Sequence, residues 1–275
     1  MKKALSLMTA AALVLSLAAC GSTASSAASS EAASPEAASS DAASSEAASS
    51  EAASETETAE LSTVEPGKLI MSTNAAFPPY EMTTDSGEFE GIDIETAQAI
   101  ADKLGLELQI DDMDFDAALL SVQQGKADIV MAGVTVTDER KAVMDFSDSY
   151  ATGIQSIIVP EGSDIASPDD LAGKKIGTQR GTTGYIYCSD DFGDDAVVAY
   201  DDGLTAVQAL NNGQVDAVVI DNAPAKEFVA ANPGLVILDT SYAEEDYAIG
   251  MAKGSSLEAA VNAALEELKA DGTLQ

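Results

Sequence analysis

The sequence predicts an α/β fold with two lobes, two chain crossings between them and a cleft where the lobes face each other. Three observations carry this prediction. Strand-like and helical segments alternate, one helix–glycine–aspartate–strand pattern occurs twice, and about 210 residues follow a low-complexity leader. A chain of that length is large for a single core and comfortable for two. We therefore expect each lobe to have its own sheet.

The first twenty residues have the pattern of a secretion signal. Lys2 and Lys3 precede an apolar run from Ala4 to Ala19, which is shorter than the ~20 residues that a membrane-spanning helix needs. The run ends in Leu-Ala-Ala followed by Cys20, which resembles the bacterial lipobox and implies a lipid on Cys20. Several acyl chains on one residue would hold the protein at a membrane. A chance cysteine beside a signal peptide is the alternative.

Residues 21–65 consist almost entirely of Ser, Ala, Glu and Thr. Acidic residues recur every five positions, which matches neither a helix face nor a strand face, and no basic residue occurs between Lys3 and Lys68. Such a segment repels itself and cannot bury a core. It predicts a disordered tether that, as a coil, spans roughly 35–40 Å.

From Pro66 onward, apolar strand-like runs alternate with segments of helical periodicity, as in α/β proteins with largely parallel sheets. The runs are nearly continuous in apolar residues, which is typical of strands that are buried on both faces. The expected strands are residues 68–73, 128–132, 154–159, 175–178, 217–220 and 236–239. The expected helices are residues 94–104, 116–124, 137–144, 204–211 and 257–269.

One sequence pattern occurs in both halves of the folded part. Residues 120–130 run as a helix end, a glycine, two further residues, an aspartate and an apolar strand, and residues 209–219 repeat that order. Gly125 and Gly213 fit the left-handed position just past a helix. Two copies predict two similar lobes. Ligands in open α/β sheets lie beyond the carboxyl ends of strands, so the residues after these two strands are the candidate site.

The composition excludes several classes of function. The chain has no histidine, which rules out Ser–His and Cys–His nucleophile pairs and histidine-ligated metal sites. It has 13 Lys+Arg against 47 Asp+Glu, a formal net charge of −34, and such a surface repels nucleic acid. Cys20 and Cys188 are the only cysteines, so no disulfide framework is expected. Cys188 lies beside acidic residues, which raise the pKa of a thiol, and is expected to be unreactive.

Two charged residues follow the two repeated strands. Thr137 is a predicted helix N-cap, with Asp138 and Glu139 in the first turn, so Arg140 lies at the start of that helix. Its guanidinium can bind a carboxylate through two parallel hydrogen bonds, although a solvated Arg140 paired with nearby acids fits the spacing equally well. Asp221 can accept from an ammonium group or cap a helix. Together, one per lobe, they would bind both charges of a zwitterion.

An ordered series of motifs runs through the folded part. The motifs are FPPYE at 77–81, GIDIE at 91–95, DF at 114–115, GVTVTDERK at 133–141, DFSDSY at 145–150, DLAGKK at 170–175 and GTT at 181–183. With this series, residues 68–271 resemble the amino-acid-binding family of ABC-transporter solute receptors. The resemblance implies the two-lobed periplasmic-binding-protein-like (type II) fold. It also implies an extracytoplasmic protein that binds an amino acid by hinge closure and serves an ABC permease, with no catalysis.

The resemblance implies a binding role for each matching position. Arg140 would bind the ligand α-carboxylate together with the backbone amides of Thr135 and Thr183. Asp221, the Gly133 carbonyl and the Thr135 hydroxyl would bind the α-ammonium group. The full predicted ligand-binding set is Asn74, Phe77, Phe115, Gly133, Thr135, Arg140, Gln179, Thr182, Thr183 and Asp221.

Ligand choice would depend on positions that vary within the family. Phe77 and Phe115 would enclose the aliphatic part of the ligand, with core packing as the alternative role for each. Asn74 stands where several relatives have Asp to meet a cationic group, and Gln179 is also uncharged. We therefore expect a neutral or weakly polar amino acid. An acidic ligand would become possible if Arg180 faced the cleft.

The predicted organisation is a signal peptide at 1–20, a tether at 21–65 and a solute-binding domain at 66–275, with lobe 1 at about 66–153 and 247–275 and lobe 2 at about 157–240. We expect a monomer without cofactor, metal or nucleic-acid partner, anchored through Cys20 at the outer face of the cell membrane or in the periplasm. A sensor domain without transport and an enzyme on the same fold, such as a dehydratase or a peptidoglycan-cleaving relative, are the alternatives. An enzyme would need an acid or base aimed at the ligand, and the sequence identifies none.

Overall fold

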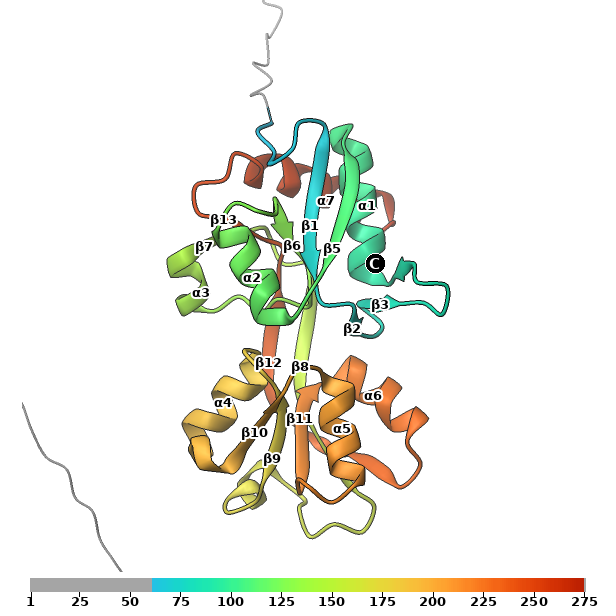
Figure 1. Ribbon diagram of the computed structural model, residues 1–275, viewed down its shortest axis with the longest axis vertical. Coiled ribbons are helices and arrows are strands. Elements are labelled where there is room, and N and C mark those ends of the chain that lie inside the picture. The colour runs from blue at the N-terminus through green and yellow to red at the C-terminus, as the bar shows by residue number, and fades with distance from the viewer. Residues whose placement is uncertain (1–60, 275) are drawn as a thin grey trace, which may run out of the picture. The chain divides into compact units, whose positions relative to one another are not determined.

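The computed structural model describes residues 61–274 and has the two-lobed α/β fold that the sequence predicts. Figure 1 shows two sheets, each covered by helices, joined by the long strands β8 (Ala151–Pro160) and β12 (Leu235–Tyr247). The predicted signal peptide, the predicted lipid site Cys20 and residues 21–60 of the predicted tether lie outside the described residues. No helix within residues 61–274 is long and apolar enough to span a membrane.

Lobe 1 is built on a five-stranded sheet with the order β5-β1-β6-β13-β7. β5 and β6 pair parallel to β1, whereas β13 pairs antiparallel to β6 and β7. The strands are β1 (Lys68–Thr73), β5 (Glu107–Asp112), β6 (Ile129–Val130), β7 (Met144–Phe146) and β13 (Gly250–Ala252). The helices are α1 (Ile92–Leu104), α2 (Phe115–Gln123), α3 (Asp138–Val143) and α7 (Glu258–Asp271). A small sheet of β2 (Ala76–Phe77), β3 (Glu81–Thr83) and β4 (Phe89–Glu90) lies at the end of lobe 1 that faces lobe 2 (Figure 1).

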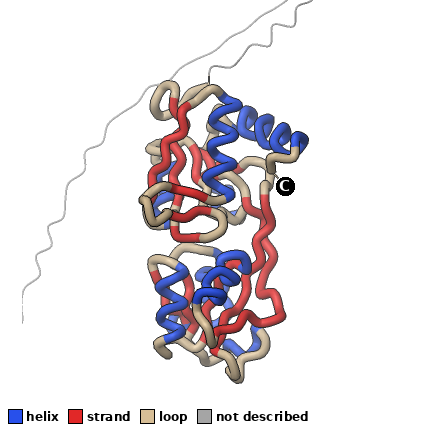
Figure 2. Tube along the Cα trace, turned by 90° about the vertical axis from the view of Figure 1, so that its right-hand side faces the viewer, coloured by secondary structure: helices blue, strands red, loops and turns tan. Residues whose placement is uncertain are grey.

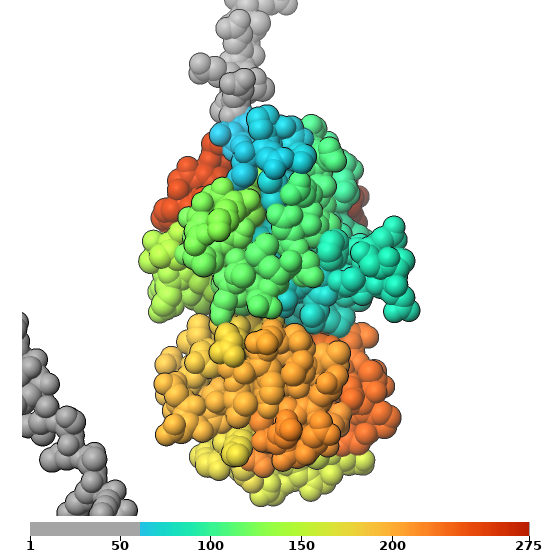
Figure 3. Space-filling view, viewed as in Figure 1, coloured from blue at the N-terminus to red at the C-terminus, as the bar shows by residue number. Residues whose placement is uncertain are grey.

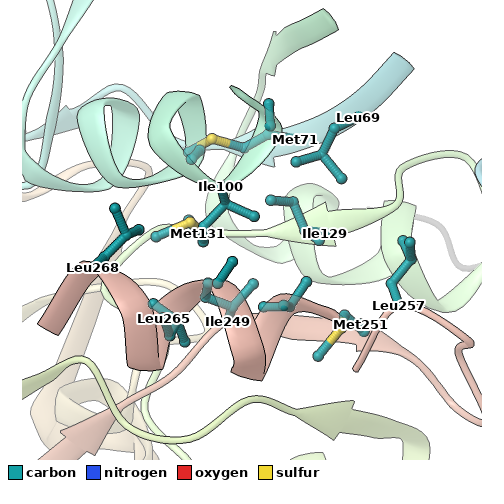
Figure 4. Packing of buried hydrophobic residues seen from close by; sticks show 14 of the residues in the cluster. Leu69, Met71, Ile100, Ile129, Met131, Ile249, Met251, Leu257, Leu265 and Leu268 are labelled. Atoms are coloured by element: carbon teal, nitrogen blue, oxygen red, sulfur yellow. The ribbon is translucent and has the colours of Figure 1, made fainter. Parts of the chain in front are cut away.

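The core of lobe 1 lies between its sheet and the helices α1 and α7. Met71 of β1, Ile100 of α1 and Leu265 of α7 are fully buried in one apolar cluster, shown in Figure 4. Burial of each such side chain contributes roughly 1.5–3 kcal/mol, so this cluster is a main source of the stability of the lobe. Leu61 packs against the same cluster, so the chain contacts lobe 1 from the first described residue onward.

Lobe 2 is built on a second five-stranded sheet with the order β10-β9-β11-β8-β12. β9 pairs parallel to β10 and β11, and β8 pairs antiparallel to β11 and β12. The remaining elements are β9 (Ile176–Gln179), β10 (Val197–Tyr200), β11 (Ala217–Asp221), α4 (Thr183–Phe192), α5 (Gly203–Asn211), α6 (Asn222–Ala231) and the short 3₁₀ helices at Pro168–Leu171 and Asp194–Ala196. In the order of each sheet, three parallel strands are thus followed by two strands that are joined to the sheet by antiparallel pairing.

The repeated sequence pattern marks the same structural unit in both lobes. Gly125 after α2 and Gly213 after α5 have left-handed φ angles of 65° and 67°, as predicted. The aspartate that follows each glycine accepts a backbone hydrogen bond from the neighbouring parallel strand or from the residue just before it. Asp128 accepts from an N–H of β1 at 2.8 Å, and Asp216 accepts from the N–H just before β9 at 2.7 Å. The prediction of two similar lobes, each with its own sheet, is confirmed.

Two antiparallel strands carry the chain between the lobes. β8 and β12 pair from Ala151 opposite Tyr247 to Pro160 opposite Leu235, with irregular register around residues 237–243. Figure 2 shows both strands running from one lobe to the other. The predicted crossings at residues 153–156 and 240–246 fall within these strands.

The expected elements do not include the helices α4 and α6 or seven of the strands, namely β2, β3, β4, β5, β7, β10 and β13. β5 and β10 each form one edge of a five-stranded sheet and are only partly buried, so they lack the continuous apolar pattern of a central strand. α4 and α6 are ten-residue helices without a long apolar repeat. Both helices follow closely on strands whose ends carry predicted ligand-binding residues. The start of each helix is therefore set by the end of the preceding strand and is not marked by an amphipathic pattern.

Candidate functional site

A cavity lies between the lobes at the carboxyl ends of the strands and is partly open to solvent. The space-filling view in Figure 3 shows the surfaces of the two lobes meeting closely at this level. The cavity is lined by Asn74, Phe77, Glu81, Phe115, Ala132, Gly133, Thr135, Arg140, Gln155, Gln179, Thr182, Thr183, Val219, Ile220, Asp221 and Tyr247. All ten residues of the predicted ligand-binding set are in this lining.

Arg140 reaches the cavity from the first turn of α3. The hydroxyl of Thr137 accepts from the Arg140 N–H at 3.2 Å, so the predicted N-cap is confirmed. Arg140 as a whole residue is 8% exposed, and its guanidinium donates to the Thr135 carbonyl at 2.7 Å and to the Gly181 carbonyl of lobe 2 at 3.2 Å. Its central carbon lies 5.4 Å from the centroid of the Phe115 ring, within the range of a cation–π contact. Arg140 is therefore a buried, positioned cation and not a solvated surface residue.

Asp221 reaches the cavity from the end of β11. One carboxylate oxygen accepts from the Ala223 N–H at 2.9 Å and caps α6, and the other accepts from the Ile154 N–H of β8 at 2.7 Å. Both readings of the sequence therefore apply, because the side chain caps a helix and lines the cavity. Burial raises the pKa of Asp221 above its ordinary value, and the two N–H donors oppose that shift.

Aromatic rings form one wall of the cavity. Phe77 stacks on Tyr80 at 5.8 Å between ring centroids, and Tyr80 meets the edge of Tyr247 at 5.4 Å. Phe115 is buried in the core of lobe 1 beneath Arg140. Phe77 packs against the core of lobe 2, so this ring contacts both lobes as well as the cavity.

Two amides of the cavity lining meet across the cleft. Gln179 Nε2 donates to Asn74 Oδ1 at 2.8 Å and to the Asp201 carbonyl at 3.3 Å. Asn74 Nδ2 donates to the Met113 carbonyl at 2.9 Å. Two neutral side chains therefore satisfy each other and join lobe 1 to lobe 2.

A hydroxyl and carboxylate network lies between the two charged residues. The Thr135 hydroxyl donates to Glu245 Oε2 at 3.1 Å and lies 3.4 Å from the Thr183 hydroxyl of lobe 2. Gln155 Nε2 donates to the same Glu245 oxygen at 2.9 Å. Thr182 caps α4, so the N-terminus of this helix points its free N–H groups at the cavity, an arrangement suited to an anion.

Arg180 lies outside the cavity. Its side chain is 57% exposed, and its guanidinium is 3.8 Å from Asp201. Among residues 61–274, Arg140 is therefore the one cation of the cavity lining. Cys188 is buried in lobe 2, and burial, with a smaller effect from Asp191, raises the pKa of its thiol to about 12. The expected direction of this shift is confirmed, but its main cause is burial and not the neighbouring acids.

The predicted set omits several residues of the lining. Glu81 lies within the FPPYE motif but carried no sequence signal of its own. Gln155 and Tyr247 belong to β8 and β12, where the pairing of the two crossing strands brings them to the cavity. No local pattern reports such a pairing between residues more than ninety positions apart.

The ring of Tyr247 is held between two glycines, and this predicts the effect of filling one of them. A Cβ at Gly153 would lie 2.5 Å from that ring, and a Cβ at Gly133 would lie 3.2 Å from its other side. We expect Gly153→Ala to cost about 1–3 kcal/mol of unfolding free energy, as overpacking of a buried site does, and to push the ring into the cavity. Chemical denaturation measures the first effect, and ligand titration measures the second. Thr152→Ala, at the next, exposed position of β8, is the control, and equal stability of the two variants would contradict this account.

Comparison with known proteins places this geometry in context. A family model described as bacterial extracellular solute-binding proteins, family 3, matches residues 69–275. The L-cystine-binding protein TcyJ of Escherichia coli (strain K12) is 34% identical over 216 residues, covering 77% of this chain and 81% of that protein. The arginine-binding extracellular protein ArtP of Bacillus subtilis (strain 168) is 33% identical over 220 residues, covering 76% and 83%. The solved structure of an ancestral arginine-binding protein bound to glutamine is 42% identical, with a TM-score of 0.73 and coverage of 76% of this chain and 95% of that one.

Proposed function

The chain belongs to the bacterial extracellular solute-binding proteins, family 3, and from this premise we propose that its interlobe cavity binds the zwitterionic head of a neutral or weakly polar amino acid. At the coarser level, it is an extracytoplasmic amino-acid-binding protein that works with an ABC-transporter permease, and it is not an enzyme. We further propose which groups of the cavity bind the ligand and which ligand side chains the cavity accepts.

The observation that carries the proposal is the placement of Arg140 and Asp221 on the lining of one cavity, one in each lobe. A guanidinium binds a carboxylate through a bidentate pair of charge-assisted hydrogen bonds. A carboxylate at the end of β11 accepts hydrogen bonds from an ammonium group. A zwitterion satisfies both residues at once, so ligand binding and contact between the lobes favour each other.

The neutral side chain of the ligand is inferred from the remaining charges. Asn74 and Gln179 in the lining are uncharged and already hydrogen-bonded to each other. Arg180 lies outside the cavity, so the lining has no second cation that could bind an acidic side chain of the ligand. Once Arg140 and Asp221 are matched by the ligand head, an added negative charge finds no cation in the lining, and an added positive charge finds only the fully buried Glu81, so either charge would be desolvated at a cost.

Closure of the two lobes is the proposed mechanism of capture. We take lobe 1 as about residues 66–153 and 247–275 and lobe 2 as about residues 157–240, with β8 and β12 as the hinge. The bonds from Gln179 to Asn74 and from Arg140 to the Gly181 carbonyl cross the cleft and would break on opening. The protein would act as a monomer, because one chain supplies every residue of the cavity lining.

The proposed site of action is the outer face of the membrane. Cys20 in the Leu-Ala-Ala-Cys sequence would carry the lipid, and residues 21–65 would let the binding domain move above the bilayer. Membrane fractionation of a Cys20→Ser variant tests this attachment, since continued retention by the membrane would reject lipid on Cys20 as the anchor.

Isothermal titration of the full chain carrying Cys20→Ser against the twenty amino acids and L-citrulline tests the function. Arginine and citrulline have the same length and differ in side-chain charge, so they form a matched pair. We expect a neutral amino acid to bind most tightly and citrulline to bind at least about tenfold more tightly than arginine, since a ligand charge left without a partner costs more than 1.4 kcal/mol.

The two levels of the proposal fail in different ways. Absence of binding by every amino acid would reject the cavity as an amino-acid site. A preference for arginine over citrulline, as the names of ArtP and the ancestral protein would suggest, would leave the amino-acid site intact and reject the neutral ligand.

A further inference from the structure

Two buried carboxyl groups meet beside the cavity. Glu81 of β3 and Asp93 in the first turn of α1 are both 0% exposed, and Glu81 is part of the cavity lining. Phe77 and Glu81 are opposite each other in the β2–β3 pair. Side chains of directly opposite residues lie on the same face of a sheet, so the carboxyl group lies beside the aromatic wall.

The hydrogen bonds of this pair are incomplete unless a proton lies between the two groups. Asp93 Oδ2 accepts from the Gly133 N–H at 3.1 Å and from the Tyr150 hydroxyl at 2.8 Å. Asp93 Oδ1 and both oxygens of Glu81 find no donor among residues 61–274, although the two carboxyl groups lie within hydrogen-bonding reach of each other. An ionised carboxylate only accepts hydrogen bonds, whereas a protonated one donates. One proton shared by the pair satisfies both groups.

The surroundings of the pair favour the shared proton. The titratable groups that face it are Asp112 of β5 and the hydroxyls of Tyr80 and Tyr150, and none of them brings a positive charge. Burial, with Asp93 as the next cause, raises the pKa of Glu81 well above its ordinary value. Burial also raises the pKa of Asp93, to about 6, against the opposing effect of its donors. The proton therefore belongs mainly to Glu81, and the negative charge belongs to Asp93.

The position of Asp93 connects this pair to the ligand. Its carboxylate holds the N–H of Gly133, the residue whose carbonyl is proposed to accept from the ligand ammonium group. It also accepts a hydrogen bond from the hydroxyl of Tyr150. The backbone N–H of Tyr150 in turn donates to the carbonyl of Tyr247, the last residue of β12, at 2.9 Å. We propose that Glu81 and Asp93 share one proton and act as a positioning pair that fixes the Gly133 segment for the ligand head. This inference rests on the proposed amino-acid site, and it makes Glu81 an uncharged part of the cavity wall.

Infrared spectroscopy of the full chain carrying Cys20→Ser tests the shared proton without any ligand. At about pH 7 the other carboxyl groups are expected to be ionised, so we expect a carbonyl band of a protonated carboxylic acid. Glu81→Gln should abolish the band. Glu88→Gln, which changes an exposed Glu in the turn before β4, is the matched control and should leave it in place. Absence of the band from the unsubstituted pair would overturn the inference, whatever the variants do.

Affinity for L-glutamine, used as a neutral probe, tests the positioning role. Gln at position 81 donates to Asp93 as the protonated acid does, so Glu81→Gln is expected to bind within about threefold of the parent. Asp93→Asn removes the charge that holds two donors, and we expect it to weaken binding at least about tenfold. Equal losses in the two variants would overturn the positioning role. If the parent binds no amino acid at all, the proposed function fails, whereas the infrared band still decides whether the proton is shared.

Discussion

Replacement of Arg140 by alanine is expected to weaken the binding of every amino-acid ligand by about 3–5 kcal/mol, the cost of removing one partner from a buried ion pair. This corresponds to a loss of roughly a hundredfold to several thousandfold in affinity. The reason is geometric as well as electrostatic. The guanidinium is held over the Phe115 ring and by the Thr135 carbonyl, both in its own lobe, so opening of the lobes leaves it in place and the ligand need not order it. Calorimetric titration with the tightest-binding amino acid measures the loss.

Arg180→Ala is the matched control for this experiment. Arg180 has the same side chain and lies one residue from Gly181, but it is mostly exposed and paired with Asp201 outside the cavity. A surface substitution of this kind changes free energies by about 0.5 kcal/mol or less, so affinity should change by no more than about twofold. If Arg140→Ala bound the ligand as tightly as Arg180→Ala does, Arg140 would not be the carboxylate-binding residue.

Asp221→Asn is expected to cost about 2–5 kcal/mol of binding free energy, the range for truncating one partner of a buried charge pair. The substitution keeps an oxygen that can cap α6 and removes the charge that would meet the ligand ammonium group. Burial raises the pKa of Asp221, so the ionised carboxylate costs the ligand-free protein stability above its pKa. Loss of that charge does not itself destabilise the fold, but the asparagine NH2 group cannot accept from the Ile154 N–H, so we expect a modest loss of stability from that bond. Titration calorimetry and thermal unfolding, measured together, separate the two effects.

The pH dependence gives a second measure of Asp221. Protonation of its carboxyl competes with the ligand ammonium group, and because burial raises the pKa of Asp221, this competition begins at a higher pH than for an exposed aspartate. Affinity of the parent should fall as the solution becomes acidic, and Asp221→Asn should lose part of that dependence, the remainder coming from protonation of Asp93, whose pKa burial raises to about 6. Asp216→Asn is the control, since Asp216 precedes the opposite end of β11 and binds only the N–H before β9. Unchanged affinity in Asp221→Asn would contradict its role.

Much of the fold was predictable because its determinants are local. The central strand β1 was predicted with its observed bounds, and the periodic helices α1, α2, α5 and α7 were found to within three residues at each end. The repeated glycine and aspartate pattern predicted the second lobe, since each glycine ends a helix and each aspartate accepts a hydrogen bond from the backbone of a neighbouring strand segment. These are contacts within one strand–helix–strand unit, and the sequence reports them directly.

The candidate site was predicted for a related reason. Arg140 and Asp221 each follow a strand of the repeated unit, and the carboxyl ends of parallel strands meet at one edge of each sheet. The remaining members of the set came from resemblance to the family, and all of them line the cavity. Their roles toward a ligand stay predictions until binding is measured.

Other parts of the site depend on contacts that no local pattern reports. Tyr247 lines the cavity because β12 pairs with β8, and Gln179 meets Asn74 because the lobes close on each other. Arg180 and Gln179 are neighbours in sequence, yet one faces solvent and the other lies in the cavity lining. The side-chain alternation along β9 continues into this segment, so the fold of lobe 2 and not the residue type determines which of the two can meet a ligand.

The sequence by itself determined the class of the fold and the two-lobed organisation, and it put forward Arg140 and Asp221 as candidate ligand-binding charges, because helix period, strand burial and helix caps are set by short stretches of residues. Only the tertiary structure decided that Arg140 is buried, that Arg180 is outside the cavity and that Glu81 meets Asp93 away from water. Charge state and ligand choice depend on desolvation and on neighbours brought from distant segments. Glu81 and Asp93 meet once lobe 1 has folded, whereas Gln179 and Asn74 meet only when the lobes close.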